Sequence, residues 1–227
     1  MYFCALLFLH MQLFLTEDGS HTLYSELVEE CYHSIHGAIQ ESNHIFMDSA
    51  WNCCRKPELN IFEVGFGTGL NAFLTLCQAG EERKKVYYTS VEYYPLEVVT
   101  ARKLNFAAQI NPAYEDLFVK MHESPWNEPV EITPFFVLNK IQGDFTALEL
   151  ENSYDVIYFD AFSPDKQPDM WAQERFEMLY NHTAPGGVLT TYCAKGMVRR
   201  AMQAAGYQVE RLPGPPGKRE ILRAVRR

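Results

Sequence analysis

Residues 60–70 of the chain read Asn-Ile-Phe-Glu-Val-Gly-Phe-Gly-Thr-Gly-Leu, a β-rich run followed by three alternating glycines. The run Asn60–Val64 predicts a strand, and the apolar spacing after Gly69 predicts a helix. Glycines at 65, 67 and 69 permit a tight turn and let a ligand approach the backbone where the helix begins. The stretch therefore predicts a strand, turn and helix unit that binds a nucleotide-like cofactor.

The sequence that follows alternates strand-like and helix-like segments. We expect further strands at 86–91, 136–141, 154–159 and 186–192, and a closing strand pair at 207–212 and 219–225. Helices are expected over 96–108, 170–180 and 195–205. Such alternation is typical of an α/β domain with a mostly parallel sheet. Residues 1–59 precede the sheet, and residues 109–143 are interpreted as an elaboration over its edge.

Composition sets outer limits on the fold and location. The 227 residues, 47% hydrophobic and 22% charged, suit one structural domain. Within it, residues 60–227 are expected to form the catalytic part and residues 1–59 an N-terminal extension packed on it. No apolar run reaches the roughly 18 residues that span a bilayer, and the opening segment lacks the design of a signal peptide. We therefore expect a cytoplasmic protein without a membrane partner.

Cysteine and histidine placement gives no reason to expect a metal. The six cysteines include no C-x-x-C pair, so we interpret them as small buried hydrophobes in a reducing compartment. His33 and His36 lie close in sequence without a second spaced pair of ligands. Packing and hydrogen bonding are the expected roles of these two histidines.

The type of cofactor follows from the residues around the glycine turn. A dinucleotide fingerprint needs a third glycine where this chain has Leu70, so the phosphate-binding form of the turn is incomplete. The methyltransferase form uses Glu63 at the strand end, and S-adenosylmethionine carries no phosphate. This donor is therefore favoured. A nicotinamide dehydrogenase, or a turn that binds nothing, remains an alternative.

Two later acidic residues are candidates for further cofactor contacts. Glu92 ends the second strand, 27 residues after Gly65, where a carboxylate can accept hydrogen bonds from both ribose hydroxyls. Asp144 follows the next strand and can accept from an adenine amino group. A solvated strand end is the alternative for Glu92, and ordinary turn chemistry is the alternative for Asp144.

An acceptor site is predicted at the end of the strand 154–159. The sequence Asp160-Ala-Phe-Ser-Pro places a carboxylate at the carboxyl end of a central strand, where ligands bind in open α/β sheets. Asp160 can accept hydrogen bonds from the N–H groups of an amine and so aim the lone pair of the amine nitrogen at a methyl group. Phe162 can exclude water. We expect Asp160 to be catalytic and Phe162 to contact substrate.

Five short segments together resemble the methyltransferase half of the MnmC family: 63–71, 160–171, 198–200, 205–207 and 217–220. The resemblance runs from about Thr16 to Ala224. It implies a Rossmann-like class I S-adenosylmethionine-dependent methyltransferase fold, with a mostly parallel seven-stranded sheet and an antiparallel final strand. It also implies conversion of 5-aminomethyl-2-thiouridine to 5-methylaminomethyl-2-thiouridine at the tRNA wobble position.

The resemblance also implies roles for particular residues. Cofactor contacts are implied at Glu63, Gly65, Gly67 and Glu92, and a catalytic role at Asp160. Tyr24, Tyr32 and Glu41 are implied to close over the cofactor. The first ten residues precede the likeness, so we expect them to be dispensable and Met11 to be the effective start.

Many family members carry a fused flavin-dependent oxidase, for which 227 residues leave no room. We therefore expect methylation only, with a separate enzyme supplying the free amine. The net charge of −9 fits a tRNA substrate poorly, but residues 195–227 hold nine Lys or Arg against two Glu, a local charge of +7. The expected phosphate contacts are Lys195, Arg199, Arg200, Lys218, Arg219 and Arg223.

Other readings remain open. The basic segment can instead be a solvated tail, and the enzyme can act on a small-molecule amine. A binding module without a cofactor would not need Glu92 or Asp160.

Overall fold

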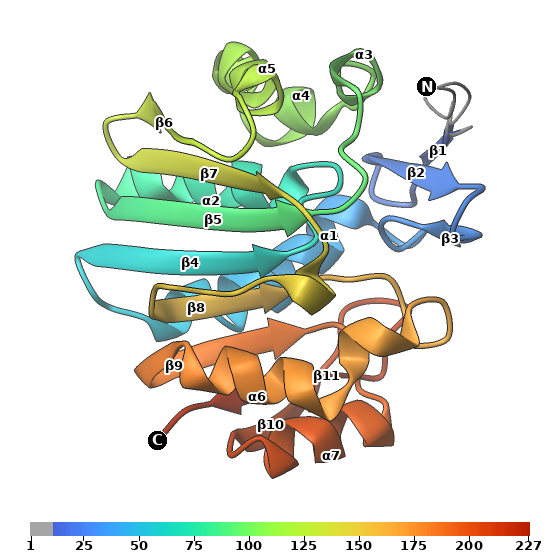
Figure 1. The fold of residues 1–227 in the computed structure, drawn as a ribbon. Helices are drawn as coiled ribbons and strands as arrows, with labels where there is room; N and C mark the ends of the chain where they lie inside the picture. The colour runs from blue at the N-terminus through green and yellow to red at the C-terminus, as the bar shows by residue number, and fades with distance from the viewer. Residues whose placement is uncertain (1–10) are drawn as a thin grey trace, which may run out of the picture.

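A computed structural model describes residues 11–227 and shows an eight-stranded sheet with helices on both faces (Figure 1). The strand order is β10-β11-β9-β8-β4-β5-β7-β6. The strands are β4 (Glu58–Val64), β5 (Lys85–Glu92), β6 (Pro129–Thr133), β7 (Phe136–Gln142), β8 (Tyr154–Phe159), β9 (Thr183–Thr191), β10 (Gln208–Pro213) and β11 (Glu220–Val225). The five central strands from β9 to β7 pair in parallel. The predicted α/β class is confirmed.

The sheet differs from the expected seven strands at one edge. β6 pairs antiparallel with β7 and arises from the segment interpreted as an elaboration. Without it, β7 would present a row of unpaired backbone groups at the sheet edge. At the other edge β11 inserts between β9 and β10 and is antiparallel to both, which confirms the antiparallel final strand.

The helices cover both sheet faces, with α2 behind the sheet and α6 in front of it in the view of Figure 1. They are α1 (Ala38–Ser42), α2 (Leu70–Glu82), α3 (Val98–Ala101), α4 (Phe106–Ile110), α5 (Glu115–Glu123), α6 (Gln173–Asn181) and α7 (Gly196–Ala204). No helix within residues 11–227 has the length and apolar character needed to cross a membrane.

The single helix predicted over 96–108 is instead the pair α3 and α4. The break coincides with Asn105, whose side chain accepts from the His21 backbone N–H at 2.8 Å and donates to the Gly19 carbonyl at 2.9 Å. Apolar spacing alone does not report this tertiary contact. Asn105 thereby ties the N-terminal segment to the large sheet.

Residues before the large sheet form a small antiparallel sheet of β1 (Met11–Leu15), β2 (His21–Ser25) and β3 (Glu30–Cys31). Figure 1 shows it beside the ends of the central strands to which the arrowheads point. The N-terminal segment therefore stands next to the edge where α/β sheets bind ligands. The expectation about Met1–His10 lies outside the described residues.

The core lies on the two faces of the central strands. Every residue of β8 is buried, as an apolar central strand requires. Tyr158 packs toward Phe46 on one face, with ring centres 5.0 Å apart, and Phe159 packs against Trp171 on the other at 4.7 Å. Packing on both faces fixes the strand whose end carries Asp160.

Candidate functional site

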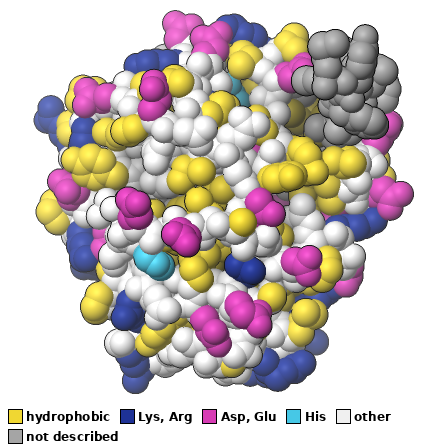
Figure 2. Space-filling view, in the orientation of Figure 1, with side chains coloured by type: hydrophobic (Ala, Val, Ile, Leu, Met, Phe, Trp, Pro, Cys, Tyr) yellow, Lys and Arg dark blue, Asp and Glu magenta, His cyan; other side chains and the backbone are white. Residues whose placement is uncertain are grey.

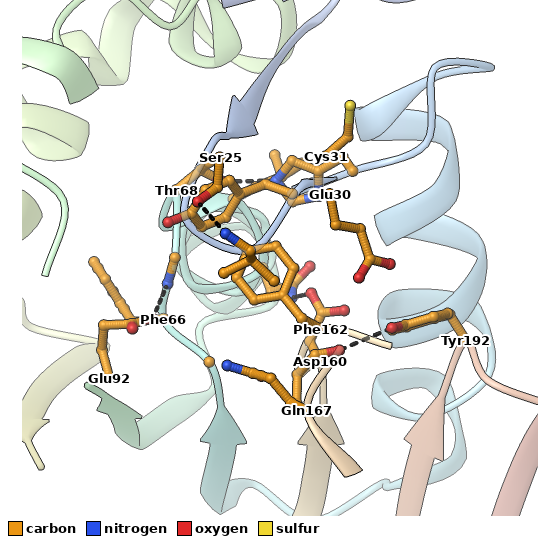
Figure 3. Close-up of a pocket in the computed structure, with 18 of the residues that line it drawn as sticks. Ser25, Glu30, Cys31, Phe66, Thr68, Glu92, Asp160, Phe162, Gln167 and Tyr192 are labelled. Carbon is orange, nitrogen blue, oxygen red and sulfur yellow. Dashed lines mark hydrogen bonds between the residues drawn. The ribbon is translucent and has the colours of Figure 1, made fainter. Parts of the chain in front are cut away.

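A cavity of about 560 Å³ lies at the carboxyl ends of the parallel strands. Its walls come from the glycine turn after β4, the loops after β5, β7 and β8, residues within 25–36, and the turn between β10 and β11. Figure 3 shows side chains from several of these segments converging on one space. The fold thus gathers segments that are far apart in the sequence.

The glycine turn forms part of the cavity wall as predicted for Gly65 and Gly67, whereas Gly69 does not line it. Gly65 has φ +93°, and a Cβ there would lie 2.7 Å from the Asp160 carbonyl oxygen. A Cβ on Gly67, at φ +48°, would lie 3.0 Å from the Tyr32 ring. The absence of side chains therefore lets the turn approach both the loop after β8 (residues 160–167, the acceptor loop) and the cavity wall formed by residues within 25–36 (the N-terminal wall).

Glu92 lines the cavity and is held by backbone N–H groups. Its Oε2 accepts from Gly67 at 3.0 Å, and Oε1 accepts from Tyr94 at 2.9 Å. Burial raises the pKa of this carboxyl, and the backbone N–H groups oppose that rise. Each carboxylate oxygen can accept a second hydrogen bond, so Glu92 has the capacity to bind a ribose diol.

Asp144 also lines the cavity, and it takes part in a turn at the same time. Its Oδ1 accepts from the Thr146 backbone N–H at 2.8 Å and from the Thr146 hydroxyl at 2.7 Å. Both contacts use one oxygen, so the two interpretations of Asp144 are compatible. The turn orients the carboxylate, and Oδ2 can accept from a ligand.

Glu63 is completely buried and does not line the cavity, unlike the expected cofactor contact. Its Oε1 accepts from Asn71 Nδ2 at 3.0 Å, and Oε2 accepts from the Ser90 hydroxyl at 2.7 Å. Burial, with the nearby Asp160 carboxylate as a lesser cause, raises the pKa of Glu63 to about 8. Any influence of Glu63 on a ligand must therefore pass through its neighbours.

Asp160 lines the cavity at the end of β8, where it was predicted. Its Oδ2 accepts from Asn71 Nδ2 at 2.8 Å, so one amide group holds both Glu63 and Asp160. Burial, with Glu41 as a lesser cause, raises the pKa of Asp160 to about 7 against the opposing effects of Asn71 and Lys218. The carboxyl can therefore exchange a proton near neutral pH.

Asn71 was missed in the sequence analysis. The available signal was an amide side chain in the first turn of a helix whose buried residues are mostly apolar.

The acceptor loop continues into an aromatic wall. Phe162 lines the cavity and packs edge-on against Tyr32, with ring centres 5.0 Å apart. The Trp171 indole N–H donates to the Phe162 carbonyl at 2.8 Å, and the Tyr192 hydroxyl donates to the Ala161 carbonyl at 2.9 Å. These bonds fix the loop that presents Asp160.

The basic residues expected to bind phosphate do not form one surface around the cavity. Lys218 alone of them lines it, with Nζ 2.8 Å from Glu41 Oε1 and 5.1 Å from the Tyr192 ring centre. Lys195 pairs with Asp165 at 2.5 Å, and Arg223 pairs with Glu210 at 2.7 Å. The remaining members, none lining the cavity, are Arg199, Arg200 and Arg219. Figure 2 shows Lys and Arg interspersed with Asp and Glu on the visible face.

The residues implied to close over the cofactor separate into two groups. Tyr32 and Glu41 line the cavity, whereas Tyr24 does not.

His33 contacts the Thr68 hydroxyl through Nε2 at 2.6 Å, and burial lowers its pKa to about 4, so it is neutral at pH 7. Within residues 11–227 no group of three potential metal ligands gathers at one point.

The residues of the cavity fit S-adenosylmethionine. The bare backbone at Gly65 and Gly67 provides a cradle that a Cβ would fill. Glu92 and Asp144 can accept from the ribose and the adenine amino group, and the acidic walls suit a positively charged sulfur. The strand order is that of the Rossmann-like fold of S-adenosylmethionine-dependent methyltransferases, and the site lies where that fold binds its ligand.

Comparison with known proteins supports this class and narrows it. A family model described as S-adenosyl-L-methionine-dependent methyltransferase matches residues 136–227. The bifunctional MnmC protein of tRNA 5-methylaminomethyl-2-thiouridine biosynthesis from Cupriavidus metallidurans is 28% identical over 226 residues, covering 91% of this chain and 32% of that protein. The protein of the same name from Pseudomonas savastanoi is 31% identical over 216 residues, covering 86% and 32%. The predicted similarity to MnmC proteins is confirmed, and the chain spans about one third of their length.

Solved structures agree on the fold. MnmC2 from Aquifex aeolicus superimposes with a TM-score of 0.77 at 23% identity, covering 94% of this chain and 70% of that one. Spermidine synthase from Thermotoga maritima gives a TM-score of 0.62 at 13% identity, covering 95% and 68%. The fold therefore extends to enzymes with other names, and the reaction must be argued from the site.

Proposed function

We propose that the protein is an S-adenosylmethionine-dependent N-methyltransferase that converts 5-aminomethyl-2-thiouridine to 5-methylaminomethyl-2-thiouridine at the tRNA wobble position. The observation that carries this proposal is the placement of Asp160 in the cavity, against the glycine turn at Gly65. The names of the MnmC relatives supply the substrate class. We further propose that a separate enzyme provides the free amine and that the reaction takes place in the cytoplasm.

The chemistry requires a neutral amine aimed at an electrophilic carbon. When bound, S-adenosylmethionine supplies a methyl group on a positively charged sulfur. A primary amine is protonated in neutral water, and Asp160, with a pKa of about 7, can accept its proton at Oδ1 or Oδ2. The carbon–nitrogen bond then forms as the carbon–sulfur bond breaks, leaving a secondary ammonium group beside Asp160. Phe162 and Tyr32 shield the site from water.

Methyl transfer to defined RNA tests the proposal. The protein is incubated with S-adenosylmethionine and tRNA carrying the unmethylated aminomethyl group, and the digested nucleosides are analysed by mass spectrometry. We expect a gain of one methyl group on that nucleoside with the wild type and almost none with Asp160→Ala. Wild-type protein that leaves the nucleoside unchanged would refute the tRNA reaction.

A small-molecule amine is the alternative acceptor. The same assay with the free nucleoside separates the two, because a tRNA enzyme uses binding energy from the remote parts of its substrate for catalysis. Equal kcat/KM for free nucleoside and tRNA would favour the small-molecule reaction.

A further inference from the structure

The charges that line the cavity are unbalanced. Five carboxylates face it, those of Glu30, Glu41, Glu92, Asp144 and Asp160. Lys218 is the one Lys or Arg in the described part of the chain that lines it, and Glu41 already pairs with that ammonium at 2.8 Å. The cavity therefore favours ligands that bring positive charge.

Glu30 belongs to the N-terminal wall and is held by the acceptor loop. Its Oε2 accepts from the Ser163 backbone N–H at 3.1 Å and from the Ser163 hydroxyl at 2.9 Å. Both bonds engage the same oxygen, so Oε1 can accept from a ligand. Figure 3 shows the side chain directed into the cavity, on the side where Asp160 and Tyr192 lie.

Glu30 and Asp160 both influence the Tyr192 phenol. Both carboxylates raise the pKa of the Tyr192 phenol above its ordinary value, after burial as the largest cause. That phenol donates to the Ala161 carbonyl, next to Asp160 in the chain. Both carboxylates therefore lie near the Tyr192 phenol, and Glu30 holds Ser163 in the loop that begins at Asp160, although the two come from β3 and the end of β8.

The side chain of Asn71 is a separate indication that the ligand carries a hydrogen-bond donor. Asn71 is 3% exposed and lines the cavity, and its Nδ2 donates to both Glu63 and Asp160. Its Oδ1 is buried and has no hydrogen-bond partner among residues 11–227. Buried polar atoms are nearly always partnered, and Asn71 lines the cavity, so a ligand N–H is a candidate partner for this oxygen.

We propose that Glu30 and Asp160 recognise the acceptor as an alkylammonium ion, which makes Glu30 a specificity-determining residue. The aromatic side chains of Tyr32, Phe162 and Tyr192 line the same cavity and complete a site of the kind that binds such cations. This inference rests on the proposed function, and it adds that Glu30 selects an aminomethyl group over a neutral group of similar size.

Binding of two small probes tests the inference without methyl transfer. The full chain, saturated with S-adenosylhomocysteine, is titrated by NMR with 5-aminomethyluridine and with 5-hydroxymethyluridine. We expect the wild type to bind the amine at least about tenfold more tightly, the scale of one close charge pair. Glu30→Gln, which keeps an oxygen to accept from Ser163, is expected to reduce this ratio to about threefold or less.

Glu29→Gln is the matched control. Glu29 adjoins Glu30 but pairs with Lys166 at 2.9 Å, its side chain is 71% exposed, and it does not line the cavity. The control is expected to keep the wild-type ratio, and all three proteins are expected to melt at the same temperature. An unchanged ratio in Glu30→Gln, an equal loss in Glu29→Gln, or no preference in the wild type would each overturn the inference.

Methyl transfer to tRNA is measured on the same preparations. A wild type that prefers the ammonium probe but does not methylate tRNA would retain the ammonium site and refute the proposed acceptor. The two failures are therefore distinguishable.

Discussion

The carboxyl ends of β4 and β5 each bring a glutamate toward the glycine turn, yet the two side chains have different surroundings. Glu63 is buried beneath the cavity and is held by the side chains of Asn71 and Ser90. Glu92 lines the cavity and is held by the backbone N–H groups of Gly67 and Tyr94. Glu63 precedes the last strand residue, whereas Glu92 is the last residue of its strand, so they meet different layers. Similar sequence positions therefore do not imply a shared ligand.

Substitution of Asp160 has the largest expected effect on turnover. This carboxylate lines the cavity and shares the Asn71 amide group with the buried Glu63. Asp160→Ala should lose at least about 100-fold in turnover, the scale of removing one preorganised electrostatic group, while S-adenosylmethionine affinity stays nearly normal. Asp160→Asn should fall between, since its amide oxygen accepts a hydrogen bond but carries no charge. Single-turnover kinetics and calorimetry check both values. Turnover of the alanine variant within about threefold of wild type would make Asp160 structural.

The pH dependence of turnover offers a second measure of the same carboxyl. Burial raises the pKa of Asp160 to about 7, and the proposed proton acceptor is its ionised form. The value of kcat/KM should therefore rise with pH, with a midpoint near 7, and fall about tenfold per pH unit below it. A profile flat between pH 5.5 and 8 would contradict this role.

The same substitution at Glu63 and Glu92 separates the roles of the two glutamates. Glu92→Gln should weaken S-adenosylmethionine binding about tenfold, because hydrogen bonds to a charged acceptor contribute roughly 1.5–3 kcal/mol each. Glu63→Gln should leave that affinity within about twofold, since Glu63 does not line the cavity. Calorimetric titration of both variants with S-adenosylmethionine measures these affinities. Equal losses would show that the buried layer also governs cofactor binding.

Stability against pH distinguishes Glu63 in another way. Its folded pKa is about 8, above the ordinary value of 4.5, so between these pH values the folded chain binds a proton that the unfolded chain has lost. This contribution makes the wild type less stable as pH rises through that window. Glu63→Gln should remove part of the slope, so its melting temperature should gain on the wild type between pH 5.5 and 8. A parallel pH dependence in the two proteins would contradict the assigned shift.

The smallest expected effect is that of changing Arg199 and Arg200, which tests whether tRNA contacts the protein outside the cavity. Reversal of Arg199 and Arg200 to Glu should raise KM for tRNA and leave S-adenosylmethionine affinity unchanged, because neither residue lines the cavity. Each lost phosphate contact should flatten the log-log salt dependence by about one unit. An unchanged salt slope would place tRNA on another surface.

The local sequence pattern was sufficient to predict most strands of the large sheet and the cavity residues that follow the strand ends. Gly65, Gly67, Glu92, Asp144 and Asp160 all line the cavity, because the carboxyl ends of parallel strands meet at one edge. The pattern was insufficient where a tertiary contact competes with periodicity. Asn105 interrupts the predicted helix by bonding to residues 19 and 21, and β6 adds an eighth strand by pairing with β7.

Residues adjacent in the chain were enough to predict the strand, turn and helix unit at 60–70 and the carboxylates after successive strands. Which of these carboxylates face the cavity, and which groups hold them, depends on contacts between distant parts of the chain. Glu30 contacts Ser163, which lies 133 residues further along the chain, and Lys218 contacts Glu41, which precedes the large sheet. Such pairs form because folding brings remote loops to one sheet edge, which no local pattern reports.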